Sequence, residues 1–235
     1  MIDIHSHILP GVDDGARTLT DSVDLVKELV ESGATAIVAT PHYVSETRYV
    51  SPKRENLKLF EELKRVISDE GINVDLFLGN EIYIDRSIEQ LIKIGKIVPM
   101  ASSDYLLVEF PLNESFPNYR DILMDLVKNG YKVILAHPER YAIVQKDFSL
   151  LQDLSDIGVL FQCNLGSIIG KYGREAKKIL KKMAKNRMIF AFGSDIHHCR
   201  GAEYWISAQK KLSKYYSEED LKRVLITNPK KMINR

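Results

Sequence analysis

The sequence has little cysteine, no excess of charge of either sign and no long apolar run. Two cysteines in 235 residues, Cys163 and Cys199, are too few for a disulfide framework and are typical of a reducing compartment. The 33 Lys and Arg residues nearly balance the 32 Asp and Glu residues, so the net charge of +1 gives no sign of general nucleic-acid binding.

Membrane and export signals are missing as well. No apolar stretch approaches the length needed to cross a bilayer, and the first residues resemble a strand rather than a basic, apolar leader. We therefore expect a cytoplasmic protein that is not inserted in a membrane. Because no linker, repeat or low-complexity segment divides the chain, we also expect residues 1–235 to form one domain.

Seven short runs rich in Ile, Val and Leu indicate buried strands: residues 1–4, 35–40, 74–78, 105–108, 131–136, 158–162 and 188–192. Helical patterns lie between them; several stop at a glycine, and Ser51-Pro52 is typical of a helix start with proline in the first turn. Alternating strands and helices predict an α/β fold, in which parallel strands form a closed or nearly closed barrel of the TIM type.

A polar cluster follows each of the seven runs. His5-Ser6-His7, Pro41-His42 and His137 follow three of them, and Ser194-Asp195-Ile196-His197 follows the last. The other runs lead to Glu81, Glu109 and Asn164. Because barrel enzymes hold their chemistry at the carboxyl ends of the strands, we expect these side chains to gather at one end of the barrel.

The donor types in these clusters favour a metal site. Imidazole and carboxylate together suit Zn, Mn or Fe, and no thiolate set that would favour structural zinc is present. Each residue alone has an ordinary interpretation as a core histidine or a salt-bridge partner, but their shared position after separate strands favours ligation. The candidate ligands outnumber the needs of one ion, so two or three are implied: His5, His7, Asp14, His42, Glu81, Glu109, His137, Asp195 and His197.

These motifs resemble the PHP (polymerase and histidinol phosphatase) metallohydrolases, whose fold is a distorted (β/α)7 TIM-like barrel with three metals. The opening residues 1–16 are similar to one branch, the bacterial capsule and exopolysaccharide tyrosine-protein phosphatases. Further matches span the chain: Ala39-Thr40-Pro41-His42, Gly79-Asn80-Glu81-Ile82, Leu107-Val108-Glu109-Phe110, Ala136-His137-Pro138-Glu139-Arg140 and Asn228-Pro229.

The resemblance implies a specific arrangement of ligands. One metal is expected on His5, His7, Glu81 and Asp195; Glu81 bridges to a second on Glu109 and His137; Asp14, His42 and His197 hold the third. The acidic Asp13-Asp14 pair favours the tyrosine phosphatase branch, because histidinol phosphatases usually place a histidine near this position. Asp13 remains an alternative ligand to Asp14.

The implied activity is that of a metal-dependent protein-tyrosine phosphatase. A metal-bound hydroxide is expected to attack phosphorus directly, and the most fitting metal is Mn, with Fe or Zn as alternatives. Arg140 and Arg200 follow two strands and are candidates for binding the phosphate, although Arg200 lies closer to Asp195 than the branch pattern implies. The implied substrate is the tyrosine-rich tail of a bacterial tyrosine kinase in capsule or exopolysaccharide synthesis.

Other reaction classes fit less well. Cysteine-dependent tyrosine phosphatases need an arginine six residues after the cysteine, where this chain has Ile169 and Trp205, and we expect Cys163 to be inert core. No serine-hydrolase elbow or P-loop occurs. A histidinol-phosphatase-like enzyme, a PHP-type nuclease and a non-catalytic binding module remain alternatives.

The best candidate for a nucleic-acid groove is residues 171–187, with eight Lys or Arg and one acid. Its apolar residues recur at helical spacing, which favours an amphipathic helix with a solvated basic face over a nuclease groove. We therefore expect no nucleic-acid partner, and the basic face is a candidate for holding a phosphorylated tail. The oligomeric state is left open.

Overall fold

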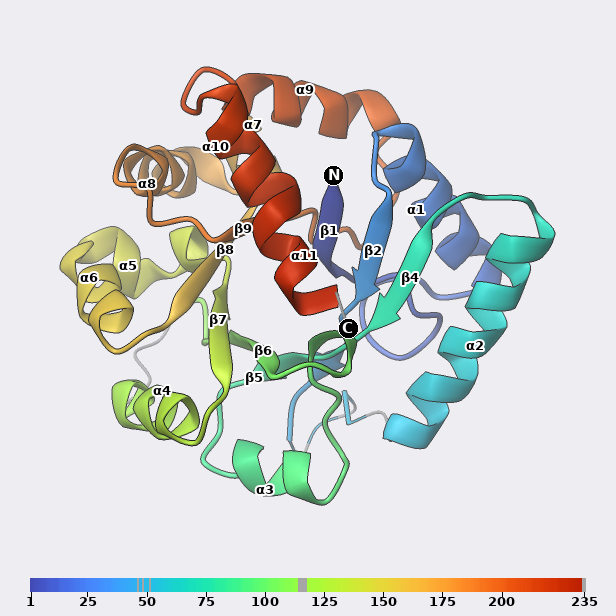
Figure 1. Cartoon of the computed structure of the whole chain (residues 1–235), viewed down its shortest axis with the longest axis horizontal. Coiled ribbons are helices and arrows are strands. Elements are labelled where there is room, and N and C mark those ends of the chain that lie inside the picture. Colours follow the sequence, from blue (N-terminus) through green and yellow to red (C-terminus); the bar gives the residue numbers. More distant parts are fainter. Residues whose placement is uncertain (46, 48, 51, 114–117, 234–235) are drawn as a thin grey trace.

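The computed structural model describes residues 1–45, 47, 49–50, 52–113 and 118–233, with the strands inside a ring of helices (Figure 1). One sheet has the order β1 (Ile2–Ser6), β2 (Ala36–Ala39), β4 (Asp75–Leu78). The other has the order β3 (His42–Tyr43), β5 (Glu81–Tyr83), β6 (Tyr105–Glu109), β7 (Lys132–Ala136), β8 (Leu160–Asn164), β9 (Ala191–Gly193). Every pairing between these strands is parallel.

The two sheets share one curved wall, because β2 leads into β3 and β4 leads into β5. A parallel bridge between Ser6 and Ile196 joins the first strand to the segment after the last strand. Seven strand positions therefore surround the interior, which confirms the predicted distorted (β/α)7 barrel.

The breaks within two of the strand positions were not predicted. We expected His42 and Glu81 to follow the ends of β2 and β4. They are instead the first residues of two further strands, β3 and β5, and lie directly opposite each other. Pro41 has no N–H to continue the ladder. The Asn80 side chain donates to the Pro41 carbonyl at 3.0 Å and accepts from the Val98 N–H at 2.8 Å, which holds the chain at the break.

Helices lie where the periodic patterns predicted them: α1 (Leu19–Glu31), α2 (Lys53–Asp69), α3 (Ile88–Lys93), α4 (Tyr119–Lys128), α6 (Ser149–Asp156), α8 (Gly173–Lys185) and α10 (Glu218–Lys222), which continues into a π-helical turn, η3 (Arg223–Thr227). Pro52 is the N-cap of α2 rather than its first helical residue, and Ser51 lies outside the described residues. The sequence patterns missed α5 (Ala142–Lys146), α7 (Leu165–Ile169), α9 (Ala202–Leu212), α11 (Asn228–Ile233) and the 3-10 turns η1 (Met100–Ser102) and η2 (Pro138–Arg140).

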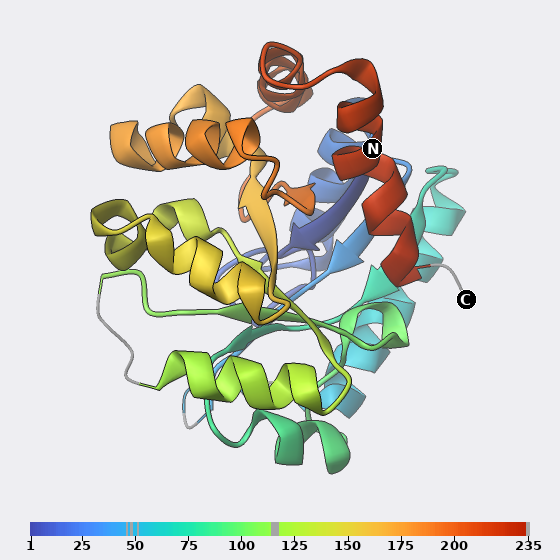
Figure 2. The ribbon, with the colours of Figure 1, turned by 60° about the vertical axis from the view of Figure 1, so that its left-hand side comes forward.

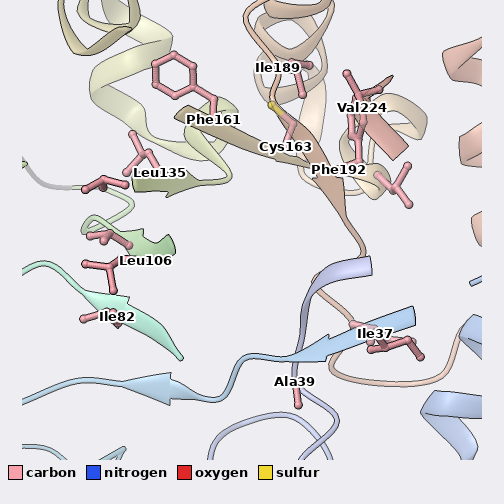
Figure 3. Packing of buried hydrophobic residues seen from close by; sticks show 14 of the residues in the cluster. Ile37, Ala39, Ile82, Leu106, Leu135, Phe161, Cys163, Ile189, Phe192 and Val224 are labelled. Carbon is pink, nitrogen blue, oxygen red and sulfur yellow. The ribbon is translucent and has the colours of Figure 1, made fainter. Parts of the chain in front are cut away.

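Two apolar clusters stabilise the barrel. The larger lies between the strands and the helices and includes Leu106, Leu135 and Cys163 (Figure 3). The smaller alternates with it along the strands, and α11, which packs beside the start of β1 (Figures 1 and 2), contributes Met232 to it. Because side chains alternate along a strand, each strand has one face toward each cluster.

The same alternation directs the polar residues into the barrel. Tyr105 and Leu107 belong to the smaller cluster, and Glu109 follows on the same face of β6. Leu160 packs on that cluster as well, and Gln162 and Asn164 follow on the same face of β8. The apolar layer thus ends in a polar layer at the carboxyl ends of the strands. Within the described part of the chain, no helix is both long and apolar enough to span a membrane.

Candidate metal centre

The structure brings all of the predicted ligands together at the carboxyl ends of the strands. A cavity of about 420 Å³ opens there, and most of these residues line it: Asp14, His42, Glu81, Glu109, His137, Asp195 and His197. His5 and His7 are fully buried beneath it, with their Nε2 atoms 3.1 and 3.3 Å from Glu81 Oε2.

Ligand atoms within the cluster form three overlapping groups, each spanning no more than 4.8 Å. The groups are His5, His7 and Glu81; His42, Glu81 and Glu109; and His7, Asp14, His42 and His197. Glu81 belongs to two of them, and its other oxygen, Oε1, lies 2.8 Å from His137 Nε2. Glu81 therefore occupies the position expected of a bridging carboxylate.

A hydrogen-bond chain behind the cluster fixes the orientation of His5. Asp195 Oδ2 accepts from Asn164 Nδ2 at 2.6 Å, so the oxygen of Asn164 is free to accept from Gln162 Nε2 at 2.9 Å. The remaining amide oxygen of Gln162 then accepts from His5 Nδ1 at 2.9 Å. Because an ionised carboxylate only accepts hydrogen bonds, the contact with Asp195 fixes which way the amide groups of Asn164 and Gln162 point. His5 therefore donates from Nδ1, and in its neutral form it presents its Nε2 lone pair to the cluster.

Asp13 fixes His7 in the same way. Its Oδ2 lies 2.8 Å from His7 Nδ1, so neutral His7 also presents its Nε2 lone pair to the cluster. Asp13 is buried and accepts in addition from the backbone N–H groups of Gly15 and His42. Asp14 instead lies 3.4 Å from His42 Nε2 and 3.3 Å from His197 Nε2. The geometry thus favours Asp14 as the ligand and gives Asp13 an orienting role.

The arrangement of lone pairs fits metal ions. The Nε2 atoms of His5 and His7 lie 3.2 Å apart, and carboxylate oxygens of Glu81 and Asp195 lie within 3.7 Å of both. In addition, Glu81 Oε2 and His42 Nδ1 are buried without a hydrogen bond of acceptable geometry, although they lie only 3.1 Å apart. Acceptors directed at a common point repel one another unless cations lie between them.

The pKa values of these groups also indicate that positive charge stabilises the cluster. Burial lowers the pKa of His42, but the carboxylates of Glu81, Asp14 and Glu109 close to its ring outweigh it and raise that pKa to about 11. Burial opposes ionisation of Glu81, yet the charges of His5 and His42 hold its pKa well below its usual range. Without metal, protons on the histidines therefore balance the carboxylates.

Backbone geometry at the site is constrained. His137 and Asp195 have φ angles of 33° and 51°, in the left-handed region that non-glycine residues seldom occupy. Gly193, just before this turn, has no room for a side chain, because a Cβ there would lie 2.6 Å from that of His5. Two strand ends are thus bent to direct ligands into the cavity.

Cations also line the cavity, and one of them contacts a candidate ligand directly. Arg140 Nη1 donates to Asp195 Oδ2 at 2.8 Å, and its guanidinium lies over the Tyr172 ring at 4.3 Å. Buried Glu139 supports the Arg140 turn by accepting from the Asn164 N–H and the Ser167 hydroxyl. Lys171 and Arg200 also line the cavity, and burial lowers the pKa of Lys171 to about 8.

A buried carboxylate outside the cavity secures the segment that carries Arg200. Glu28 on α1 accepts from the backbone N–H groups of Arg200 and Gly201, at 2.8 and 2.9 Å, and from Trp205 Nε1 at 2.6 Å. The Arg200 side chain itself is exposed and lies over the Tyr204 ring at 5.4 Å. Glu28 therefore ties α1 to the start of α9 and fixes the backbone from which Arg200 extends.

Sequence reasoning missed several of these supporting residues: Glu28, Glu139, Gln162, Lys171 and Tyr172. Gln162 had a usable signal, because it precedes Asn164 by two residues on a predicted strand and must share its face. Glu28 had none, because an acidic residue in a helical pattern is normally solvated.

Comparison with known proteins agrees with this geometry. Residues 1–234 match the family model described as capsular polysaccharide synthesis, CpsB/CapC. Tyrosine-protein phosphatase YwqE of Bacillus subtilis is 32% identical over 201 residues, 85% of this chain and 78% of that protein.

Solved structures give the same picture. A structure from work on YwqE of Bacillus subtilis and CpsB of Streptococcus pneumoniae, described as metal-dependent tyrosine phosphatases, superposes with a TM-score of 0.87 at 29% identity, covering 99% of this chain and 94% of that one. Histidinol phosphate phosphatase of Lactococcus lactis superposes with a TM-score of 0.59 at 15% identity, covering 91% of this chain and 93% of that one, which shows the fold alone.

We expect metal binding to release protons and to weaken as the pH falls. His42, with its pKa raised to about 11, is protonated at neutral pH in the metal-free protein and must lose that proton to donate a lone pair. Calorimetric titration with Mn²⁺ or Zn²⁺ in buffers of different ionisation enthalpy should show this release, with affinity rising from pH 6 to pH 8. Affinity that does not change with pH would contradict this assignment, and Glu81→Gln should bind the metal more weakly at every pH.

Replacing Glu28 with Gln should loosen the Arg200 segment. The NH2 group of the new amide would face N–H groups that now donate to the carboxylate. The lost hydrogen bonds should lower the free energy of unfolding by about 1–3 kcal/mol. Hydrogen exchange of the Arg200 and Gly201 amides should accelerate, as measured by NMR. Glu31→Gln, at an exposed position of the same helix, is the control and should change neither quantity. Unchanged protection in Glu28→Gln would show that other contacts hold the segment.

Proposed function

The chain belongs to the CpsB/CapC family of capsular polysaccharide synthesis, and we propose that it is a metal-dependent protein-tyrosine phosphatase. The observation that carries the proposal is that one cavity combines candidate metal ligands with cationic side chains. The site gathers histidine and carboxylate lone pairs directed at common points, and the same cavity is lined by Arg140, Lys171 and Arg200. Such a cavity fits a substrate that must be held by metals and by cations at once, as a phosphate monoester is.

We propose two or three divalent ions, most fittingly Mn²⁺, because mixed imidazole and carboxylate donors without thiolates suit Mn, Fe and Zn. His5, His7, Glu81 and Asp195 would hold one ion, and Glu81, Glu109 and His137 the next. Asp14, His42 and His197 would hold the third. When bound, such ions lower the pKa of water and neutralise charge on phosphate oxygens.

The protein's own contribution is to bind and orient the phosphate. Arg140 has one N–H engaged by Asp195, which holds the guanidinium in place and leaves its other donors for phosphate oxygens. Arg200 and Lys171 add charge from two further segments that line the cavity. Cations on separate elements fix the phosphate from several directions, which favours a single orientation for in-line displacement.

A tyrosine leaving group makes little demand on a general acid. A tyrosine phenol has a pKa of about 10 and leaves as an anion more readily than an alkyl alcohol does. The Tyr172 ring and Leu112 are the apolar surfaces in the cavity lining, and the cavity volume of about 420 Å³ lies within the range of small-ligand sites. A phosphotyrosine side chain therefore fits both the charge and the surfaces of this cavity.

We propose that the physiological substrate is a phosphotyrosine protein, the tyrosine-rich tail of a bacterial kinase acting in capsule or exopolysaccharide synthesis. The family description supports the capsule context. We propose the cytoplasm as its location, because the two cysteines are unpaired, as is usual for a reducing compartment. A small-molecule phosphomonoesterase with the same site chemistry is the second candidate, favoured by the shared fold of histidinol phosphate phosphatase.

The decisive experiment compares substrates on one protein preparation. Phosphotyrosine peptide should be hydrolysed, chelation should abolish turnover, and added divalent metal should restore it, while histidinol phosphate and single-stranded DNA should be poor substrates. A variant with Cys163→Ala and Cys199→Ser should retain nearly full activity, because burial raises the pKa of both thiols, that of Cys199 to about 11. Loss of activity in the folded cysteine-free protein would overturn the mechanism, and a preference for histidinol phosphate would favour the second candidate.

Arg140→Ala should lower the catalytic rate constant as well as weaken substrate binding, by about 2–4 kcal/mol of transition-state stabilisation. Arg140→Lys should not restore the loss, because an ammonium group lacks the planar pair of donors that matches two phosphate oxygens. Steady-state kinetics on phosphotyrosine peptide, with metal content measured in parallel, test this. A defect explained entirely by lost metal would show that Arg140 acts only on Asp195.

A further inference from the structure

A second cavity lies outside the candidate metal centre, where α8 approaches the end of α9. Its volume is about 190 Å³, and its lining contains no acidic residue: Ile168, Lys177, Lys181, Lys211, Lys214 and Tyr215. We call this cavity and its lining the basic groove. Figure 1 shows α7, α8 and α9 together on one side of the barrel, and α7 packs against both of the other helices.

The lysines of the basic groove carry uncompensated charge. Among the described residues, no ion pair involves any of these four side chains, whereas their neighbour Lys178 pairs with Glu175 at 3.5 Å. Lys177 and Lys181 lie one turn apart on the same face of α8, so they repel each other. An anion in the groove would relieve this repulsion.

Helix ends do not explain all of this charge. Lys211 lies in the last turn of α9, where a cation favours the helix dipole. Lys177 and Lys181 lie in the interior of α8, outside its first and last turns, where the helix dipole does not favour a cation. The dipole of α8 therefore does not account for its two groove lysines, which meet Lys211 and Lys214, at and just after the end of α9, at the groove.

The groove also offers an apolar contact. Tyr215 is 39% exposed, which is unusual for a large aromatic side chain in this protein, and Lys181 Nζ lies 5.7 Å from the centre of its ring. Ile168 lies at the groove from α7. Lysine charges around an exposed ring suit a peptide that has acidic residues and some apolar surface, rather than a simple ion.

One stretch of the chain joins the basic groove to the cavity at the candidate metal centre. Lys171 lines that cavity, and Ile168 and Lys177, at the groove, are three residues before and six residues after it. From Gly173 to Lys177 the helix rises about 6 Å. Because an extended peptide advances about 3.3 Å per residue, a few residues beside a bound phosphotyrosine would reach the groove.

We propose that the basic groove binds an acidic peptide segment that flanks the phosphotyrosine, and so selects substrates whose tyrosine lies near carboxylates or further phosphorylated tyrosines. This inference rests on the proposed function and adds the sequence context of its substrate. The basic run of α8 was already a candidate for holding a phosphorylated tail, but Lys211, Lys214 and Tyr215 come from another segment and complete the groove only in the folded protein.

The test uses two charge-reversal variants of the metal-loaded protein, Lys177→Glu with Lys181→Glu, and Lys211→Glu with Lys214→Glu. Substrates are a phosphotyrosine peptide with acidic flanks, the same peptide with neutral flanks, and p-nitrophenyl phosphate. Each variant should lose about tenfold in kcat/KM for the acidic peptide, mainly through KM, and the wild-type preference for that peptide should fade with added salt. Turnover of the other two substrates should not change.

The matched control is Lys58→Glu with Lys128→Glu, which changes the net charge equally at exposed positions on α2 and α4, elsewhere around the barrel (Figure 1). It should leave all three substrates unaffected, and an equal loss there would reduce the effect to net charge. If p-nitrophenyl phosphate is hydrolysed but groove variants treat both peptides as the wild type does, the groove inference fails and the proposed function stands.

Two further outcomes concern the phosphatase activity itself and a membrane contact. If no phosphate ester is hydrolysed, the proposed function fails, and binding of the unphosphorylated acidic peptide by fluorescence anisotropy then decides the groove inference by itself. If the variants lose only their co-sedimentation with phosphatidylserine vesicles, the groove is a membrane contact and the peptide proposal is wrong.

Discussion

The orientation of both His5 and Arg140 in the candidate metal centre depends on how the Asp195 carboxylate is held. Its Oδ2 accepts from Arg140, Asn164 and Tyr172, so only Oδ1 is left to face the histidines. The bond to Asn164 fixes the orientation of Gln162, and Gln162 in turn fixes the ring of His5. One saturated oxygen therefore sets the direction of two ligands, Asp195 itself and His5, through two amides on β8, and it also holds Arg140 beside a candidate ligand.

Such a cluster is costly to fold without cations. The carboxylates and imidazoles are buried, and two of the residues hold left-handed backbone conformations that only the surrounding structure maintains. Protons offset part of this cost in the metal-free protein, as the raised pKa of His42 indicates. Metal ions would replace those protons and, at a free concentration of about 100 times Kd, add roughly 2.7 kcal/mol to the free energy of unfolding. Stability and activity are thus linked through the same atoms.

Positive charge is arranged in layers around this centre. Arg140 touches the ligand Asp195 directly, Lys171 and Arg200 complete the cavity lining, and the lysines of the basic groove lie further out. Glu28 has a different role: within the described part of the chain it forms no ion pair, and it accepts hydrogen bonds from the backbone N–H groups of Arg200 and Gly201, just before α9. Attraction for a phosphorylated chain would therefore extend beyond the phosphate itself, although the protein has almost no net charge.

Local patterns in the sequence determined the seven strand positions, the principal helices and the set of candidate ligands. They did so because a strand's apolar run and the ligand that follows it are neighbours in the chain. Contacts between distant segments decided the rest. The breaks at Pro41 and Asn80 make His42 and Glu81 face each other, and only folding shows that Asp14 rather than Asp13 faces the cavity. The Glu28 contact and the basic groove join segments far apart in the sequence. The periodic patterns that predict helices and strands are local and carry no information about such contacts.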